Sequence, residues 1–517
     1  MGQLATSVRA GTRGLVAAAV AAAVVLPATA HPVDATRAVA AQQADPLGPL
    51  HVSENGRYFV RENGRPFFWL ADTAWSLFVN LDRDEVERYL DARAEQGFNV
   101  IQAVGVFPQA GGPGPNPYGD DPLDGGMTPA VTEGADPGDD EQYDFWDHVD
   151  FVVDAAAQRG MRIALLPAWA DKQAGSLVTT KNAKEYGEFL GERYGDDVVW
   201  VMGGDSPADG VEDVWRDLAE GVAVGANGSV DYTDLLMTYH PRGDQTSATW
   251  FHDDEWLSFN MLQGGHCRRW NNLFGLIDGN FSERPPKPFL DGESIYEDHP
   301  ICWKPEDGFS TDEDVRRNAY WSVFGGAAGH TYGHHAVWQF LEEGARAQLG
   351  ARGSWTDALD FPAGGQMQHL RALMESRPYL TRVPDQEVLT SDVTDLGAES
   401  IRATRDEEGS YLMVYTAAGR EFDVDTSVLS GSDLRAWWYD PRTGEAIDAG
   451  SVPREESVEF FPPETEKGDD GPDWVLVVDD AARGFAPPGT PFAPQEPAAP
   501  QEPPAQGEPT VPDEPAP

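Results

Sequence analysis

Two acidic residues follow short apolar segments that have the composition of buried strands. One segment is Val198-Val-Trp-Val-Met202, which is followed by two glycines and Asp205. The other is Pro288-Phe-Leu290, which is followed by Asp291-Gly-Glu293. A carboxylate at the end of a buried strand is costly to desolvate unless it has a partner or a reaction to perform. A facing pair of carboxyls is what glycoside hydrolysis needs, because one protonates the leaving oxygen and the other attacks the anomeric carbon or activates water.

Each acid also has a purely structural interpretation. Asp205 precedes Ser206-Pro207 and could cap a helix. Glu293 could form a loop ion pair with Arg268 or Arg269. We favour catalysis for both, because each acid supplies the partner that the other requires.

Two further acids and a histidine group are alternatives. Asp291 would lie on the same side of a continuing strand as Glu293 and is its main rival, and Glu297 is a weaker one. His330, His334 and His335 lack the helical His-Glu-x-x-His spacing of a zinc site. We therefore expect them to bond sugar hydroxyls, with no metal and no cofactor. A serine nucleophile is disfavoured because the sequence around Ser294 is not a Gly-x-Ser-x-Gly elbow.

The segments that must position these residues alternate between strands and helices. Helical spacing of apolar residues predicts helices at 84–96, 145–159, 181–194, 211–222 and 312–324. Strands are predicted at 67–71, 99–104, 162–166, 198–202, 235–239, 258–262, 289–290 and 329–332. This pattern predicts the α/β class and a (β/α)8 TIM barrel. A doubly wound open sheet is the alternative, and the lack of a Gly-rich nucleotide fingerprint after the first strand counts against it.

In a (β/α)8 barrel the active site lies at the carboxyl ends of the strands. The predicted strand ends and the loops after them carry many polar and aromatic residues. We expect the following side chains to bind sugar: Asp72, Trp75, Gln102, Trp169, His240, Gln263, His266, Tyr296, His330 and Tyr332.

The sequence divides into five parts. Residues 1–30 have the charged, apolar and small-residue regions of a signal peptide, and 31–48 form a polar linker. The barrel is expected over 49–378. Short β-rich segments separated by turns predict a small antiparallel β-sandwich over 379–482. The Pro/Glu-rich residues 483–517 are expected to be a disordered tail.

Composition restricts the possible partners. The 517 residues carry 37 Lys and Arg against 87 Asp and Glu, for a formal net charge of −50. This balance argues against nucleic acid and against an anionic membrane surface after signal cleavage, because no basic footprint is available. In an exported chain the two cysteines, Cys267 and Cys302, could form one disulfide. Two free thiols are the open alternative, and the oligomeric state cannot be read from the sequence.

Four motifs in strand order carry a resemblance. They are Phe68-Trp-Leu-Ala-Asp-Thr-Ala-Trp75, Gly97-Phe-Asn-Val100, Trp200-Val-Met-Gly-Gly-Asp205 and Asp291-Gly-Glu-Ser-Ile-Tyr-Glu297. Together they resemble the apiosidase-like family of glycoside hydrolases, which implies a (β/α)8 barrel followed by a collagen-binding-type β-sandwich. The resemblance also implies that Asp205 is the acid/base, that Glu293 is the nucleophile and that the reaction retains configuration. Ser206-Pro207 departs from the Arg or Asn common after Gly-Gly-Asp in the family, which leaves the leaving-group subsite open.

These observations predict a secreted glycoside hydrolase that acts on a plant or microbial polysaccharide or oligosaccharide. An apiose- or arabinose-type furanoside is the leading substrate, by resemblance. The alternatives are a non-catalytic carbohydrate-binding or adhesin protein on a barrel scaffold and, less favoured, a peptidase. The sugar, the linkage and endo or exo action remain open.

Overall fold

The computed structural model describes residues 47–109, 112–139, 141–267, 273–393, 397–463 and 472–492. The predicted signal peptide, most of the linker and the tail beyond residue 492 lie outside the described residues. The chain begins with a three-stranded antiparallel sheet, formed by β1 (Leu50–Val52), β2 (Phe59–Arg61) and β3 (Pro66–Phe67). Gly64, at a φ of 75°, forms the turn between β2 and β3, a conformation that glycine adopts without steric cost.

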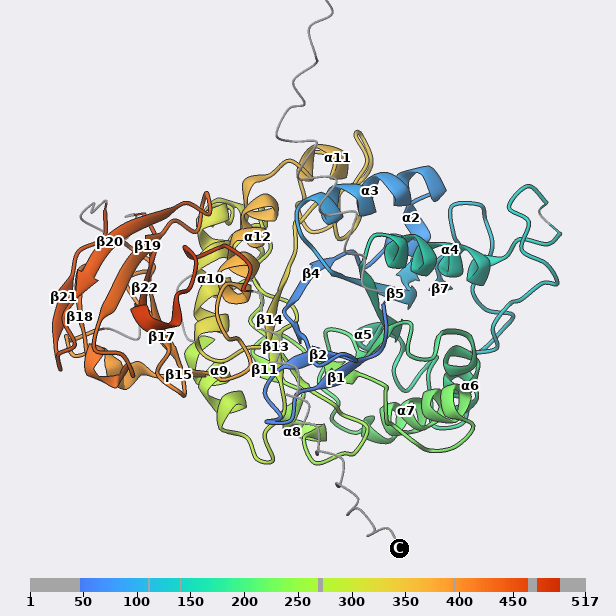
Figure 1. Cartoon of the computed structure of the whole chain (residues 1–517). Helices are drawn as coiled ribbons and strands as arrows, with labels where there is room; N and C mark the ends of the chain where they lie inside the picture. The colour runs from blue at the N-terminus through green and yellow to red at the C-terminus, as the bar shows by residue number, and fades with distance from the viewer. Residues whose placement is uncertain are drawn as a thin grey trace, which may run out of the picture. The chain divides into compact units, whose positions relative to one another are not determined.

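The central sheet contains the eight predicted strands (Figure 1). They are β4 (Trp69–Thr73), β5 (Val100–Val106), β8 (Arg162–Ala168), β9 (Val199–Gly203), β10 (Met237–His240), β12 (Asn260–Gln263), β13 (Phe289–Asp291) and β14 (Gly329–Tyr332). All neighbouring pairs among them are parallel, and β11 (Gln245–Thr246) adds an antiparallel strand to β12. The amide of Ser258 donates to the carbonyl of Met237 (2.8 Å), which links the two ends of the series. The sheet is a nearly closed barrel, as the sequence predicts.

Helices follow most of the strands. The longer ones are α3 (Arg83–Glu95), α4 (Phe145–Gln158), α6 (Ala183–Tyr194), α7 (Glu212–Asn227), α9 (Leu273–Ser282), α10 (Asp312–Phe324) and α12 (Pro362–Glu375). Reciprocal side-chain caps start three of them, at Asp82, Asp144 and Thr311. Helices α6 and α7 approach so closely that a Cβ added at Gly191 would meet the carbonyl of Val222 at 2.1 Å. The sequence analysis did not predict α9 and α12.

Short elements occupy the connections. They are α2 (Leu77–Asn80), α5 (Ala170–Gln173), α8 (Ala248–Phe251), α11 (Trp355–Ala358), the strands β6 (Pro108–Gln109) and β7 (Gly112–Pro113), and the 3-10 turns η1 (Ile301–Trp303) and η2 (Pro305–Asp307). Among the residues that the structure describes, no helix is both long enough and apolar enough to cross a membrane.

The C-terminal region is built from two antiparallel sheets. The larger runs in the order β15 (Arg382–Pro384), β16 (Ile401–Asp406), β17 (Tyr411–Thr416), β22 (Trp474–Asp480), β19 (Leu434–Tyr439) and β20 (Ala446–Val452). The smaller pairs β18 (Phe422–Val424) with β21 (Val458–Phe460). This is the predicted β-sandwich.

The central strands β17 and β22 of the larger C-terminal sheet are buried on both faces. Leu412 and Val414 of β17 belong to the core of the sandwich, whereas Tyr411, Met413 and Tyr415 belong to the core of the barrel. This division follows from the two-residue period of a strand. The ring of Tyr415 stacks on Tyr320 of α10, with the ring centres 4.8 Å apart.

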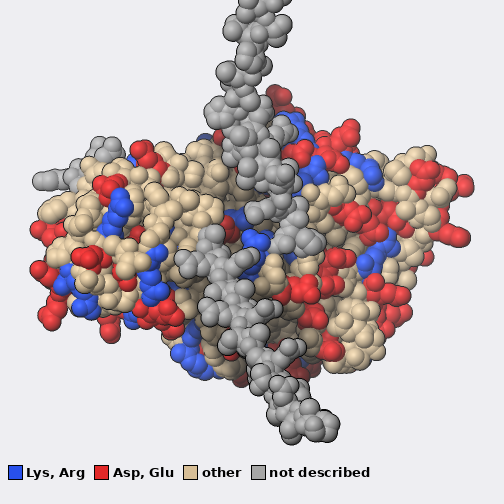
Figure 2. Space-filling model, viewed as in Figure 1, with Lys and Arg blue, Asp and Glu red and all other residues tan. Residues whose placement is uncertain are grey.

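The described chain continues past residue 483, where the sequence predicts that a disordered tail begins. The amide of Phe492 donates to the carbonyl of Glu375 in α12 (2.9 Å), and the rings of Phe485 and Phe492 are in contact. The prediction of a disordered tail from residue 483 is therefore wrong for its first ten residues, because these two aromatic side chains anchor them. Figure 2 shows acidic side chains spread over the visible face, with basic ones scattered among them.

Candidate active site

The turn after β9 directs Asp205 toward the barrel mouth. Three consecutive residues have a positive φ: Gly203 at 87°, Gly204 at 125° and Asp205 at 47°. A Cβ added at Gly204 would meet the ring of Trp169 at 2.8 Å, so glycine is required for the indole to lie there. A left-handed aspartate is a strained conformation of the kind found at functional sites.

Glu293, which follows β13, is held by two histidines at the ends of neighbouring strands. His240 Nε2 lies 3.1 Å from Glu293 Oε2, and His266 Nε2 lies 3.0 Å from Glu293 Oε1. The Nδ1 of His240 accepts the amide of Asp205 (3.2 Å), and the Nδ1 of His266 accepts the amide of Tyr296 (3.4 Å). Because each Nδ1 is an acceptor, each ring carries its proton on Nε2. His266 hydrogen-bonds Glu293 through this nitrogen, and His240 directs its own toward the same carboxylate.

The two acids have opposite charge preferences. Burial opposes ionisation of Glu293, but the hydrogen bonds from His240 and His266 outweigh it and lower the pKa of this carboxyl. Burial and the nearby charge of Glu293 raise the pKa of Asp205 to about 6, although Gln263 hydrogen-bonds its side chain. The arrangement favours an ionised Glu293 beside a protonated Asp205, which is the division of roles that a glycosidase needs.

An aromatic cavity of about 930 Å³ opens beside Asp205. Its walls include Trp75, Phe107, Trp169 and Trp338. The rings of Trp75 and Trp169 lie 5.1 Å apart. Indole rings in this setting can stack on the C–H faces of a sugar and exclude water from it.

Other predicted residues support the loop that carries Glu293. Gln102 Nε2 donates to the carbonyl of Gly292 (2.8 Å). Trp75 Nε1 donates to the hydroxyl of Tyr296 (3.0 Å), which in turn hydrogen-bonds Glu293. The structure thus brings together most of the predicted site residues, namely Trp75, Gln102, Trp169, Asp205, His240, Gln263, His266, Glu293 and Tyr296.

Three predicted sugar-binding residues lie on the other face of the sheet. Asp72 accepts hydrogen bonds from Tyr89 and from Arg93 of α3, both at 2.6 Å. Tyr332 donates to Glu297 (2.7 Å). His330 is two residues from Tyr332 on β14, so it shares that face, and burial lowers its pKa to about 3. The prediction that Asp72, His330 and Tyr332 bind sugar is wrong because strand alternation turns them toward the helices.

The rival acids also have structural partners. Asp291 Oδ1 accepts the amides of Gly264 (3.0 Å) and Glu293 (3.3 Å). Because β13 ends at Asp291, the continuing strand on which the two acids would share a side is not formed. Glu297 accepts the amide of Ala363 (3.1 Å) in addition to the Tyr332 hydroxyl. Arg268 and Arg269, the possible loop partners of Glu293, lie outside the described residues.

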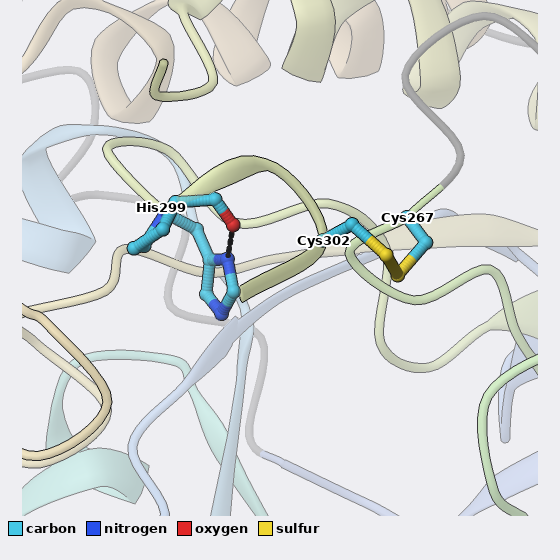
Figure 3. The surroundings of a disulfide bond; sticks show 4 residues. Cys267, His299 and Cys302 are labelled. Atoms are coloured by element: carbon cyan, nitrogen blue, oxygen red, sulfur yellow. Dashed lines mark hydrogen bonds between the residues drawn. A yellow bond between two sulfur atoms is a disulfide. The ribbon is translucent and has the colours of Figure 1, made fainter. Parts of the chain in front are cut away.

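The two cysteines form a disulfide, Cys267–Cys302, which decides the alternative that the sequence left open (Figure 3). The bond lies next to His266, whose carbonyl accepts the amide of Cys302 (2.9 Å). The sequence analysis missed Phe107 and Trp338, which line the cavity. The available signal was an aromatic side chain in the loop that follows a predicted strand.

His335 bonds within the protein through both ring nitrogens. Its Nε2 donates to the carbonyl of Leu349 (3.1 Å), and its Nδ1 accepts from Trp338 Nε1 (3.2 Å). Within the described part of the chain, no three His, Cys, Asp or Glu side chains are grouped so that they could hold a metal ion.

Comparisons with known proteins agree with this geometry. The family model "Apiosidase-like, catalytic domain" matches residues 53–381, and "Putative collagen-binding domain of a collagenase" matches residues 383–479. A solved structure named "Glycoside hydrolase" is 36% identical, with a TM-score of 0.76, and the match covers 84% of this chain and 97% of that one. A glycoside hydrolase family 5 structure from Bacteroides vulgatus is 37% identical, with a TM-score of 0.77, and the match covers 85% of this chain and 94% of that one. A search of curated proteins found no match.

The barrel, the two acids at its strand ends and the family model all describe the same part of the chain. The catalytic-domain model spans well over half of the sequence, and both relatives are matched over nearly their full length. The chain therefore belongs to the apiosidase-like family and is a glycoside hydrolase.

Proposed function

We propose that this glycoside hydrolase is secreted and cleaves an apiose- or arabinose-type furanoside from a plant or microbial polysaccharide, with retention of configuration. The observation that carries the mechanism is the pair of imidazole Nε2–H donors on Glu293 beside an Asp205 whose pKa is raised to about 6. The furanoside preference rests on the match to the apiosidase-like family model.

In the first step Glu293 acts as the nucleophile. Its carboxylate attacks the anomeric carbon while the carboxyl of Asp205 gives its proton to the glycosidic oxygen, so that the bond between that carbon and the leaving oxygen breaks. The leaving alcohol departs neutral, and the sugar remains as an ester on Glu293. Trp75 and Trp169 provide flat faces against which the sugar can stack.

In the second step Asp205 acts as the base. The ester removes the charge of Glu293, and that charge is one of the two causes that raise the pKa of Asp205. The pKa of Asp205 therefore falls, and its carboxylate can take a proton from water. The resulting hydroxide attacks the anomeric carbon and releases Glu293 as a carboxylate.

A panel of 4-nitrophenyl furanosides and pyranosides tests this assignment together with pectic polysaccharides. Glu293→Gln should abolish turnover on every substrate. Asp205→Asn should slow hydrolysis of natural linkages strongly but spare the first step on the aryl glycosides, because nitrophenolate needs no proton to leave. Asp209→Asn is the matched control, since this exposed acid lies four residues after Asp205. Turnover by Glu293→Gln, or inversion of the product anomer in an NMR time course, would contradict the proposed roles.

Export is a separate part of the proposal. It rests on the charged, apolar and small-residue pattern of residues 1–30. N-terminal sequencing of protein recovered from a culture medium should find a mature chain that starts after Ala30. A chain that stays inside the cell with Met1 intact would refute it.

A further inference from the structure

Trp303 is exposed although its ring contacts His266, one of the two histidines at Glu293. Trp303 exposes 49% of its surface, whereas Trp75 exposes 3% and Trp338 exposes 8%. Single exposed apolar residues are common on proteins, so exposure alone indicates nothing. The backbone and the ring contacts of Trp303 supply the independent observations.

The backbone at Trp303 adopts a conformation that bulky residues avoid. The φ angle is 48° at Cys302 and 65° at Trp303, in the left-handed region. Three links hold this turn: the disulfide to Cys267, the hydrogen bond from the Cys302 amide to the His266 carbonyl (2.9 Å), and the hydrogen bond from the Trp303 amide to the Pro300 carbonyl (3.0 Å). Strain that persists only because the surroundings impose it is typical of ligand clamps.

The indole of Trp303 lies one imidazole away from Glu293. Its ring is edge-on to His266 (5.2 Å between centres) and to His299 (4.5 Å). His266 and His299 stack on each other at 4.1 Å, and His266 contacts the carboxylate of Glu293. Trp303 is therefore fixed with respect to the proposed nucleophile.

The same rings connect Trp303 to the wall of the aromatic cavity. His299 lies 4.1 Å from His335, ring centre to ring centre, and His335 accepts a hydrogen bond from Trp338, which lines the cavity. Trp303 thus extends a run of aromatic side chains that begins inside the cavity and passes Glu293. Figure 3 shows His299 together with the disulfide between Cys267 and Cys302.

We propose that Trp303 is the platform of a second sugar subsite, which binds the polysaccharide residue bonded to the sugar that is cleaved. This inference rests on the proposed function. A flat, half-exposed indole held one imidazole away from Glu293 can stack on a second sugar ring, and its surface is dehydrated when the polymer binds. The disulfide and the hydrogen bonds hold the ring in place before binding, so little conformational entropy is lost.

Affinity electrophoresis measures this subsite without turnover. The inactive Glu293→Gln protein is the parent, and it is run through gels that contain arabinan or an apiose-bearing pectin. Three double variants, which add Trp303→Ala, Trp303→Leu or Trp303→Phe to the parent, are compared with it. We expect Ala and Leu to weaken polymer binding roughly tenfold and Phe to keep most of it, because only Phe retains a flat face. Phe461→Ala, which removes an aromatic residue that is 57% exposed in the C-terminal region, is the matched control and should bind as the parent does.

Kinetics of the active enzyme separate stacking from support of His266. With Glu293 intact, Trp303→Ala should raise KM for the polymer roughly tenfold and leave kcat on a 4-nitrophenyl furanoside unchanged. An equal loss of kcat on both substrates would overturn the subsite, because Trp303 would then act by holding His266. Equal polymer binding with and without Trp303 would also overturn it. Polymer binding that depends on Trp303, in a chain that hydrolyses no glycoside, would refute the proposed function and leave the subsite standing.

Discussion

The charge of Glu293 is set by the tautomers of two histidines. His240 and His266 each accept a backbone amide at Nδ1, which directs the remaining ring proton to the carboxylate. The two amides belong to Asp205 and Tyr296, so backbone groups of the loops after β9 and β13 set the tautomers of the histidines that contact Glu293. At this scale the site is a set of hydrogen bonds that holds one carboxyl ionised and lets the other stay protonated.

His266→Ala should move the acidic side of the pH–rate profile to higher pH. The substitution removes one of the donors that lower the pKa of Glu293. At low pH a larger fraction of Glu293 is then protonated, and the protonated carboxyl cannot act as the nucleophile. We expect kcat/KM at the optimum to fall by roughly 1–3 kcal/mol of transition-state stabilisation, the size of a lost charge-assisted hydrogen bond. A profile of kcat/KM between pH 3 and 8 measures both effects. An acidic limb that coincides with the wild-type limb would show that His266 does not control Glu293.

Asp205 should set the basic side of the same profile. Its carboxyl must be protonated to act, and its pKa is about 6, so activity that depends on the acid is lost as the pH rises through that value. The loss of activity at basic pH should occur for substrates with poor leaving groups. It should be absent from the first step with activated aryl glycosides. Stopped-flow release of nitrophenolate compared with hydrolysis of the polymer distinguishes the two. A basic limb retained in Asp205→Asn would assign it to another group.

Strand alternation decides which polar residues reach the site. On β4, Trp69 packs at the base of the barrel against Phe259, while Asp72 points outward to Arg93 of α3. Side chains three residues apart on a strand lie on opposite faces. The pair Asp72–Arg93 is fully buried and joins a strand to its helix, so its role belongs to the fold.

Asp72→Ala should therefore lower stability rather than catalysis. The change leaves Arg93 charged and unpaired in the interior, which costs roughly 3–5 kcal/mol in the free energy of unfolding. The folded enzyme should keep its kcat/KM. Urea unfolding with parallel kinetics tests this, and Asp91→Ala, whose carboxylate pairs with Arg159 at the surface, should cost less than about 1 kcal/mol. A stable Asp72→Ala protein with impaired kcat/KM would restore the sugar-binding role.

The barrel and the C-terminal sheet share a core at the scale of the whole chain. Two bidentate ion pairs cross between them: Arg316 with Asp473 (3.0 Å) and Arg377 with Asp479 (2.8 Å). Both arginines are buried. The face of β17 that carries Tyr411, Met413 and Tyr415 packs into the barrel core, so the sandwich covers apolar surface of the catalytic domain.

A chain that ends at residue 381 should not fold stably. It would expose the face of α10 that carries Tyr320 and would leave Arg316 and Arg377 without their carboxylates, which are large losses of burial and of charge compensation. We expect thermal scans to show a lower midpoint or aggregation. The matched control ends at residue 492 and should unfold like the full chain. A 381-residue protein that is as stable as the full chain would show that the sandwich is dispensable.

Local sequence patterns determined the barrel and its two acids. Apolar runs with the length of strands, helical spacing between them and Gly-rich turns are properties of neighbouring residues, and the eight predicted strands appear within a few residues of their positions. Asp205 and Glu293 could be identified because a charged residue directly after a buried strand is visible in the sequence. The sequence analysis did not predict helix α9 (Leu273–Ser282).

Tertiary structure decided which face each polar residue uses and which partner it meets. The two-residue alternation of a strand decides the face that each residue uses, and Asp72 and Tyr332 were misplaced because the sequence does not show which face of β4 and β14 lines the barrel. The contacts of Glu293 with His240 and His266, the disulfide, and the ring contacts of His299 with His266 and His335 join residues more than twenty positions apart. Such pairings arise from the closure of the barrel, and no local pattern in the sequence encodes them.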